Sequence, residues 1–310
     1  MNKINKFQRD EVIKIIYKAA QKNKKIFLLS ADFGAPALDD FRSKLKRQFV
    51  HLGICEQNMI DFACGMSLEG AKVYVYAMAP FLSARCYEQH KTATCLMNAN
   101  VCSIVTGIGL SYANSGPTHY STEDFACLRA LPNSMIFTAS DPSVAREIAK
   151  KTLKLNKPIF IRLDRKSNND LNSNVSSKEI DNGYRFLKRN KNAKLAIISH
   201  GTIIERAVKA YNLLDKKISS KVNIIDLIQS KPLSKAFKSH LNLYKEILTL
   251  DEQTNIGSLG SLIRENIDKN VKSLALPDKF IFENLGREKL LDQNNLSVKN
   301  ITNKIKTLIT

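Results

Sequence analysis

The chain has 310 residues, of which 44% are hydrophobic and 25% charged, and its formal net charge is +19 at pH 7. This length allows two domains of ordinary size, each with its own core. No run approaches the roughly 18 apolar residues of a membrane span, and the first twenty residues, MNKINKFQRDEVIKIIYKAA, lack the apolar centre of a signal peptide. We therefore expect a globular protein of the cytoplasm with no membrane partner.

The positive charge is unevenly distributed. Residues 51–150 contain 6 Lys and Arg against 8 Asp and Glu, whereas residues 1–50 contain 12 against 5. A nucleic-acid-binding protein would concentrate cations around its recognition motif, yet the motif-bearing segment described below is the least basic. We therefore expect no nucleic-acid partner. The six cysteines form no CxxC pair and have no His at metal-ligand spacing, so we expect reduced thiols and no metal ligands in this chain.

Helical and strand patterns alternate along the chain, which is typical of parallel sheets flanked by helices. In the first half, the patterns predict helices at 7–22, from 56, from about 80, at 123–130 and from 141, and strands at 25–30, 49–52, 71–78, 101–107, 134–140 and 158–163. We expect these elements to form one domain over 1–166.

Residues 167–183 are polar and nearly free of large apolar side chains, as an exposed linker would be, and we place the linker at 167–189. Strand and helix patterns then resume, with strands at 194–201, 221–228 and 246–253 and helices at 203–214, after 234 and at 258–266. A second domain is expected over 190–310. The predicted fold class is α/β with two domains, each a mostly parallel sheet flanked by helices.

One carboxylate occupies a distinctive position. In HLGICEQNM, His51 to Met59, Glu56 falls in the first turn of a predicted helix, directly after a short strand that we expect to be buried. The helix is indicated by apolar residues at helical spacing, namely Met59, Phe62, Ala63 and Met66. An acidic residue is favourable at a helix start for dipole reasons alone, so the other motifs decide between a structural and a chemical role.

Seven segments, taken together and in order, resemble the carboxy-terminal half of transketolase in its split, two-chain form. They are HLGICEQNM, APFLSARCYEQ, GPTHYSTED followed by LRALPN, PIFIRLDR, IISHGTIIERAVKA, IIDLIQSKPLS and DEQTNIGSLGSLI. The resemblance covers nearly the whole chain. It implies a thiamine-diphosphate pyrimidine-binding fold followed by a transketolase C-terminal domain.

The resemblance also implies a cofactor, thiamine diphosphate. Its aminopyrimidine is switched on by a hydrogen bond from a carboxyl group, and the matching acid here is Glu56. Phe81 matches the aromatic ring that lies against the pyrimidine, and Tyr87 matches a second aromatic position, with core packing as an equal alternative. Arg85 matches an Arg of split transketolase-like subunits, and Asp32 matches an acid held near the cofactor at the subunit interface.

A second group of residues matches substrate-binding positions. His119, in GPTHYSTED, matches a His that contacts sugar oxygens and moves protons during bond cleavage. Arg165 and Arg162 match positions that bind a substrate phosphate or carboxylate. Two positions depart from the family, which usually has Asp at Ser115 and His at Gly107. Ser115 is thus a candidate substrate contact, and the substrate is expected to be a phosphorylated sugar or a modified or nucleotide-activated one.

One family motif is missing from the chain, namely GDG with a downstream Asn, which holds Mg²⁺ and the diphosphate. The resemblance therefore implies an N-terminal transketolase-like subunit that carries this motif and supplies the metal ligands. The cofactor would lie between the two subunits, and an α2β2 heterotetramer would satisfy the symmetry common in oligomers.

The leading hypothesis is a subunit of a two-chain enzyme that transfers a two-carbon ketol unit between sugars. A close alternative is a 2-oxoacid dehydrogenase E1 β-type subunit or a deoxyxylulose-phosphate-synthase-like subunit, either of which would act on pyruvate or another 2-oxoacid. GPTHYSTED and the LPN that follows favour transketolase. A third possibility, from a different class, is a non-catalytic regulatory partner. A requirement for pyruvate or another 2-oxoacid would reverse the choice between the two kinds of enzyme, and binding of thiamine diphosphate by the mixed subunits separates both from the regulatory partner.

Overall fold

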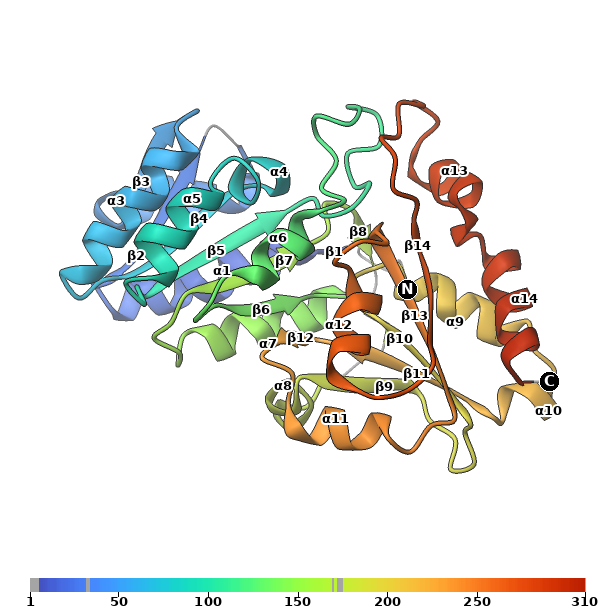
Figure 1. The fold of residues 1–310 in the computed structure, drawn as a ribbon. Coiled ribbons are helices and arrows are strands. Elements are labelled where there is room, and N and C mark those ends of the chain that lie inside the picture. Colours follow the sequence, from blue (N-terminus) through green and yellow to red (C-terminus); the bar gives the residue numbers. More distant parts are fainter. Residues whose placement is uncertain (1–5, 32–33, 169, 172–174, 310) are drawn as a thin grey trace, which may run out of the picture.

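The computed structural model describes residues 6–31, 34–168, 170–171 and 175–309. The described strands form a seven-stranded sheet, a five-stranded sheet and a two-stranded pair. The two large sheets lie side by side in an elongated molecule, the first built from the blue-to-green half of the chain except for one strand and the second from the yellow-to-red half (Figure 1). The predicted α/β fold with two domains is confirmed. Across these described ranges, the helices are too short or too polar to cross a membrane.

The larger sheet is parallel except at one edge. In spatial order its strands are β12 (Gln229–Lys231), β6 (Met135–Thr138), β7 (Ile159–Leu163), β5 (Val101–Thr106), β4 (Lys72–Met78), β2 (Ile26–Ala31) and β3 (Phe49–Gly53). β12 comes from the second half of the chain and pairs antiparallel with β6. The expectation that the strand before Glu56 is buried is wrong, because β3 is an edge strand with His51 exposed.

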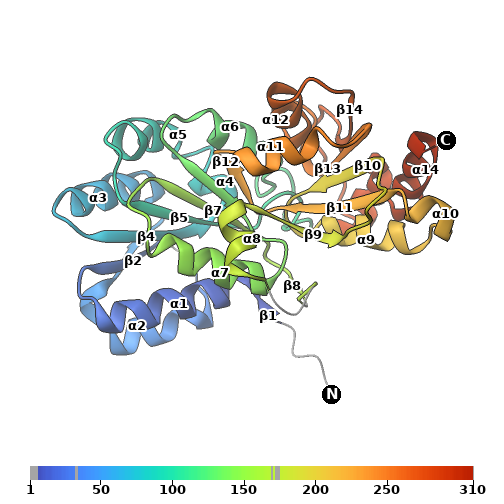
Figure 2. The same cartoon turned by 90° about the horizontal axis from the view of Figure 1, so that it is seen from below.

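Helices cover both faces of this sheet, as Figure 2 shows from below. On one face are α1 (Gln8–Lys22), η1 (Pro36–Leu38), α2 (Asp39–Lys44), η2 (Lys46–Gln48) and α7 (Pro142–Thr152). The other face has α3 (Glu56–Leu68), α4 (Ala79–Leu82), α5 (Tyr87–Gln89), η3 (His90–Cys95) and α6 (Asp124–Ala130). The inner strands β4, β5 and β7 are buried almost throughout, because a parallel sheet is covered on both sides. The helix predicted from about residue 80 is divided into α4, α5 and η3.

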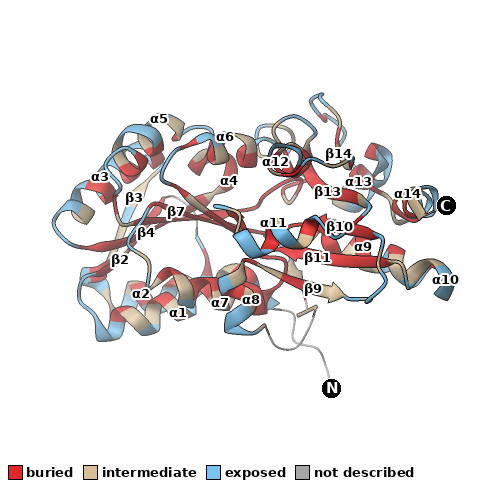
Figure 3. Ribbon diagram, turned by 60° about the horizontal axis from the view of Figure 1, so that its bottom comes forward, coloured by how far each residue is buried: buried red, intermediate tan, exposed pale blue. Residues whose placement is uncertain are grey.

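The second sheet follows the same plan on a smaller scale. Its strands, in order, are β14 (Val271–Leu276), β13 (Glu246–Thr254), β10 (Leu195–Ser199), β11 (Val222–Leu227) and β9 (Tyr184–Lys188), with β9 antiparallel to β11. The helices are α9 (Ile204–Asn212), α10 (Lys216–Ser219), α11 (Lys235–Leu241), α12 (Leu259–Asn266), α13 (Arg287–Leu291), η4 (Asp292–Leu296) and α14 (Val298–Ile309). In both domains the sheets are largely buried and the outer helix surfaces are exposed (Figure 3).

The segment predicted to be a linker contains regular structure. β8 (Ser167–Asn168) pairs antiparallel with β1 (Lys6–Phe7), and α8 (Ser177–Asn182) begins with a capping box between Ser176 and Glu179. β9 then enters the second sheet. The composition is polar because α8 is short and buries only one residue, Ile180. The domain boundaries predicted at 1–166, 167–189 and 190–310 stay predictions.

Buried ion pairs fix one domain against the other. The Arg185 guanidinium, on β9, donates to Asp141 at 2.6 Å and to Asp226 at 2.8 Å. Asp141 also caps the N-terminus of α7 by accepting from the Val144 amide. All three charged side chains are almost fully buried. Because the same cation is bound by carboxylates of both domains, these contacts tie the two sheets together.

Candidate active site

Glu56 lies where a tight turn passes from β3 into α3. Gly53 provides the positive φ of 72° that the turn requires, and α3 begins at Glu56. The predicted position in the first helical turn is confirmed. The residue is only 5% exposed, and its Oε2 accepts a hydrogen bond from Arg85 Nη1 at 2.8 Å. Asp32, predicted to lie near the cofactor, falls outside the described residues.

Arg85 connects this carboxylate to an aromatic ring. It lies in the turn between α4 and α5, with its side chain 40% exposed. Its guanidinium carbon is 4.1 Å from the centre of the Phe81 ring, which is a cation–π contact. Tyr87, half-buried at the start of α5, packs against the apolar core, which is the alternative that the sequence left open for it.

His119 also contacts Phe81. The two rings meet edge to face, with centroids 5.5 Å apart. The imidazole Nδ1 is 2.9 Å from the Thr118 hydroxyl, and the His119 amide donates to the Gly116 carbonyl at 3.0 Å. The loop is therefore tightly turned around His119, and this turn presents the ring to Phe81.

Tyr112 extends the series of contacts to Arg165. Its ring lies 6.4 Å from that of His119, and the Arg165 guanidinium carbon is 4.6 Å from its centre. We call the resulting series of six side chains the contact row, and it consists of Glu56, Arg85, Phe81, His119, Tyr112 and Arg165. The sequence predicted five of them. Tyr112 was missed because a loop has no periodicity, although the unusual Gly107 nearby was a signal that something else fills that space.

Arg162 and Ser115 are placed differently from each other. Arg162 is fully buried, and it donates from Nε to Asp124 Oδ2 at 2.7 Å and from Nη2 to Oδ1 at 2.9 Å. This differs from the expectation that Arg162 binds substrate, because Asp124 already satisfies its charge inside the protein. Ser115 is exposed, and its amide donates to the Tyr112 carbonyl at 2.8 Å, so it belongs to the loop beside the contact row.

The second domain holds the loop that carries His119. Glu252 Oε1 accepts from the Leu110 amide at 2.9 Å. Gln253 accepts from the Phe125 amide at 3.2 Å and donates to the Ser121 carbonyl at 2.8 Å. Side chains of the DEQ sequence at the end of β13 thus form hydrogen bonds with the backbone at both ends of the loop. No site residue was predicted in the second domain from the sequence, since these hydrogen bonds depend on the way that the two domains pack.

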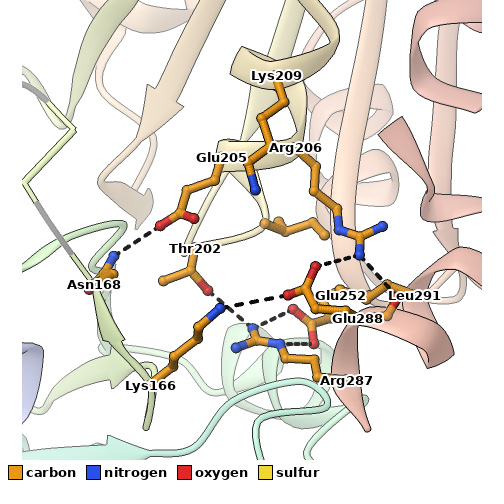
Figure 4. A pocket seen from close by; sticks show the side chains of 11 residues that line it. Lys166, Asn168, Thr202, Glu205, Arg206, Lys209, Glu252, Arg287, Glu288 and Leu291 are labelled. Atoms are coloured by element: carbon orange, nitrogen blue, oxygen red, sulfur yellow. Dashed lines mark hydrogen bonds and ion pairs between the residues drawn. The ribbon is translucent and has the colours of Figure 1, made fainter. Parts of the chain in front are cut away.

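Arg287 links Glu252 to the strand end that precedes Arg165. It donates to both oxygens of Glu252, at 2.8 and 2.6 Å (Figure 4). Its Nη1 lies 2.7 Å from Asp164. Thr202 also donates to Asp164. Burial tends to raise the pKa of Asp164, but the charge of Arg287 and the Thr202 hydroxyl outweigh it and lower that pKa. Burial raises the pKa of Glu252, against the opposing effect of Arg287.

The part of the site that can bind a cofactor is the end of the contact row at Glu56. It combines a buried carboxylate, the half-exposed Arg85 guanidinium and the half-buried Phe81 ring. Within the described ranges, no group of three or more His, Cys, Asp or Glu residues is arranged to hold a metal ion. The groups at this end are suited to a hydrogen bond and to aromatic stacking, and the other end, at Arg165, is suited to an anion.

Both domains match family models that belong to the same kind of protein. The profile described as transketolase, pyrimidine binding domain, matches residues 9–169, and that of transketolase, C-terminal domain, matches residues 185–301. One of the subunits of apulose-4-phosphate transketolase from Phocaeicola vulgatus is 28% identical over 270 residues, which is 84% of each chain. 1-Deoxy-D-xylulose-5-phosphate synthase of Thermotoga maritima is 29% identical over 302 residues, or 94% of this chain and 48% of that protein. A split gene transketolase, solved as an inactive β4 tetramer, superposes with a TM-score of 0.84 and 25% identity over 98% of both chains.

Proposed function

The chain belongs to the transketolase family, and we propose that it is the pyrimidine-binding and C-terminal subunit of a two-chain enzyme that transfers a two-carbon ketol unit between sugars. The single observation that supports this most strongly is Glu56. Its carboxylate is buried at the start of α3, and the contact row joins it to His119, a group able to move protons.

The residues at the Glu56 end fit half of thiamine diphosphate. When bound, this cofactor supplies the carbon nucleophile that breaks and forms the carbon–carbon bond. Glu56 would hydrogen-bond the pyrimidine nitrogen, and Arg85 holds the carboxylate in place at 2.8 Å. Phe81 offers the face of a half-buried ring to a flat heteroaromatic group. Tyr87 would support this wall from the core.

The residues at the other end would bind the substrate. The Thr118 hydroxyl at Nδ1 fixes the His119 ring, so we propose that Nε2 meets a substrate hydroxyl and exchanges its proton. Arg165 is exposed and would bind a phosphate through its planar guanidinium. Ser115, in the same loop, would face the sugar. These roles support phosphorylated sugars as the substrate class.

A second subunit would complete the site. The surface around α3 exposes several apolar side chains, namely Ile54 at 72%, Phe62 at 46%, Leu96 at 75% and Met97 at 51%. Such a patch is typical of a protein interface. We propose that it is covered by an N-terminal transketolase-like subunit, which supplies the Mg²⁺ ligands, in a cytoplasmic α2β2 heterotetramer. The similarity to one of the subunits of apulose-4-phosphate transketolase supports this arrangement.

A second candidate is condensation with pyruvate. The similarity to 1-deoxy-D-xylulose-5-phosphate synthase, which covers 94% of this chain, favours it. The two reactions differ in their donor, because the ketol transfer uses a ketose whereas the condensation uses a 2-oxoacid.

The experiment that tests the proposal mixes this chain with an N-terminal subunit and supplies thiamine diphosphate and Mg²⁺. We expect turnover of a ketose phosphate with an aldose acceptor in the absence of pyruvate, and no turnover with either subunit alone. Turnover that requires pyruvate would replace the first candidate by the second. Failure of the mixed subunits to bind thiamine diphosphate would contradict both.

A further inference from the structure

Tyr112 occupies space that a side chain at position 107 would need. Gly107 has a φ of +93°, and a Cβ atom built on it would lie 2.0 Å from Cε2 and 2.7 Å from Cδ2 of Tyr112. Both distances are far below any tolerated contact between carbon atoms. The observed position of the Tyr112 ring and a side chain at residue 107 therefore exclude each other.

The ring holds the substrate end of the contact row together. Tyr112 is only 6% exposed, and its ring lies beneath the exposed Arg165 guanidinium at 4.6 Å. On another side it contacts the His119 ring, and its carbonyl accepts from the Ser115 amide at 2.8 Å. One aromatic residue thus touches every group that we propose for the substrate's phosphate and hydroxyls.

The Tyr112 hydroxyl contributes little to these contacts. It is buried and has no hydrogen-bond partner among the residues that the structure describes. Burial raises the pKa of Tyr112 to about 12, although Arg165 and Arg9 oppose the shift, so the phenol is uncharged near neutral pH. The contact that positions the Arg165 guanidinium is therefore made by the aromatic ring of Tyr112 and not by its hydroxyl.

We propose that Tyr112 is a positioning residue that determines substrate specificity. Seated against Gly107, its ring holds the Arg165 guanidinium where it binds the substrate phosphate, and it puts an aromatic surface where a side chain at 107 could have made hydrogen bonds. Selection would then depend on the phosphate more than on the sugar hydroxyls nearby. The inference rests on the proposed function in one respect, namely the substrate's phosphate.

The first test measures binding of inorganic phosphate to the full chain by calorimetry. We expect Arg165→Gln to abolish binding, Tyr112→Leu to weaken it about three- to tenfold through loss of the cation–π contact, and the conservative variant Tyr112→Phe to retain it. Equal affinity in the wild type and Tyr112→Leu, or no phosphate binding by the folded wild-type chain, would overturn the proposal.

A double-mutant cycle tests whether the Tyr112 ring acts through Arg165, and Tyr112→Met, whose flexible side chain fills irregular gaps, replaces Tyr112→Leu if that variant folds poorly. Arg165→Lys keeps the charge but loses the planar group that stacks on the ring. We expect Tyr112→Phe and Arg165→Lys to combine additively, because the ring is retained, and Tyr112→Leu to add nothing further to Arg165→Lys. Additive losses for Tyr112→Leu and Arg165→Lys would mean that the ring does not act through Arg165, which would contradict the proposal.

The reconstituted enzyme separates this inference from the proposed function. Tyr112→Leu is expected to raise KM for a phosphorylated ketose by a similar factor, with smaller effects on kcat and on KM for the same sugar without phosphate. A general structural defect would lower kcat for both sugars, and that result would overturn the inference. If the wild-type complex had no transferase activity, the proposed function would fail while the phosphate-binding result would still decide the role of Tyr112.

Discussion

Glu56 and Arg85 form an ion pair in which the carboxylate is buried and the guanidinium is half exposed. Their atoms Oε2 and Nη1 are 2.8 Å apart, while the exposed fractions of the two side chains are 6% and 40%. A buried carboxylate is costly without a partner, and Arg85 provides one from the side that faces solvent. The same cation lies over the Phe81 ring, so one residue orients both groups that we propose for the pyrimidine.

Arg85 should therefore affect both activity and stability. We expect Arg85→Met to lower turnover of the reconstituted enzyme about three- to tenfold, as loss of a cation–π contact would. The free energy of unfolding should fall by about 1–3 kcal/mol, because the buried Glu56 carboxylate loses its partner. Urea unfolding and initial rates measure the two effects. A variant that unfolds much more easily while keeping full turnover would contradict the role assigned to Arg85.

Arg162 should contribute more to stability. It is fully buried and bound through two hydrogen bonds to Asp124. Removing one member of such a pair leaves an uncompensated charge, and Arg162→Met is expected to cost about 3–5 kcal/mol of stability. The double variant Arg162→Met with Asp124→Leu should recover most of that loss. Equal destabilisation of the single and double variants in urea would show that the pair is not responsible.

Arg287 forms buried ion pairs beside the candidate site that should stabilise the folded chain. Asp164 and Glu252 share this cation, and both carboxyl groups are buried. Arg287→Met should destabilise the chain by about 3–5 kcal/mol at neutral pH. The loss should shrink as the pH falls, since both carboxyl groups can then become neutral. A destabilisation that is independent of pH between 7 and 4 would contradict this explanation.

The burial of His90 predicts a further dependence of stability on pH, distinct from that of the Arg287 ion pairs. The imidazole is fully buried, and its Nε2 lies 2.8 Å from the Leu82 carbonyl. Burial lowers its pKa from 6.5 to about 4, despite the raising effect of that carbonyl. The unfolded chain therefore binds a proton first, and stability falls as the pH decreases from about 6.5 to about 4, by on the order of 3 kcal/mol in total.

The control for this effect is His90→Gln, which keeps a side chain able to donate to the Leu82 carbonyl but does not titrate. We expect the difference in unfolding free energy between the wild type and this variant to narrow in acid. Only the wild type has an imidazole that must stay uncharged in the folded protein, so only the wild type loses this stability as the pH falls. Thermal denaturation at pH 7, 6 and 5 measures it. Parallel curves for the two proteins would remove His90 as the cause.

The sequence predicted the elements that have strong local patterns. Residues 7–22 were expected to be helical and form α1 (Gln8–Lys22), because an apolar stripe repeats at helical spacing. The strands of both sheets were likewise located, since continuous runs such as VCSIVT are buried on both faces. The edge position of β3 was missed, because the apolar residues of a short strand do not reveal how many neighbours it has.

The candidate site was predictable only in part. The family motifs located Glu56, Phe81 and His119, and their contacts follow from the way that parallel strands end at one edge of a sheet. Tyr112 was missed because the sequence shows that Gly107 leaves space but not which side chain of the loop fills it. The hydrogen bonds from the second domain to the His119 loop were missed for a related reason. Glu252 and Gln253 look like ordinary polar residues until the domains are packed together.

The central claim is that Glu56 activates the cofactor, and the most direct measurement is kcat of the reconstituted two-chain enzyme with Glu56→Gln. The amide has nearly the same size and can still meet Arg85, so the variant should fold and assemble with the partner. We expect kcat to fall by about 10²–10⁴-fold, as for loss of a proton-transferring group, with assembly unchanged by light scattering. Wild-type kcat in a correctly assembled Glu56→Gln enzyme would contradict the account.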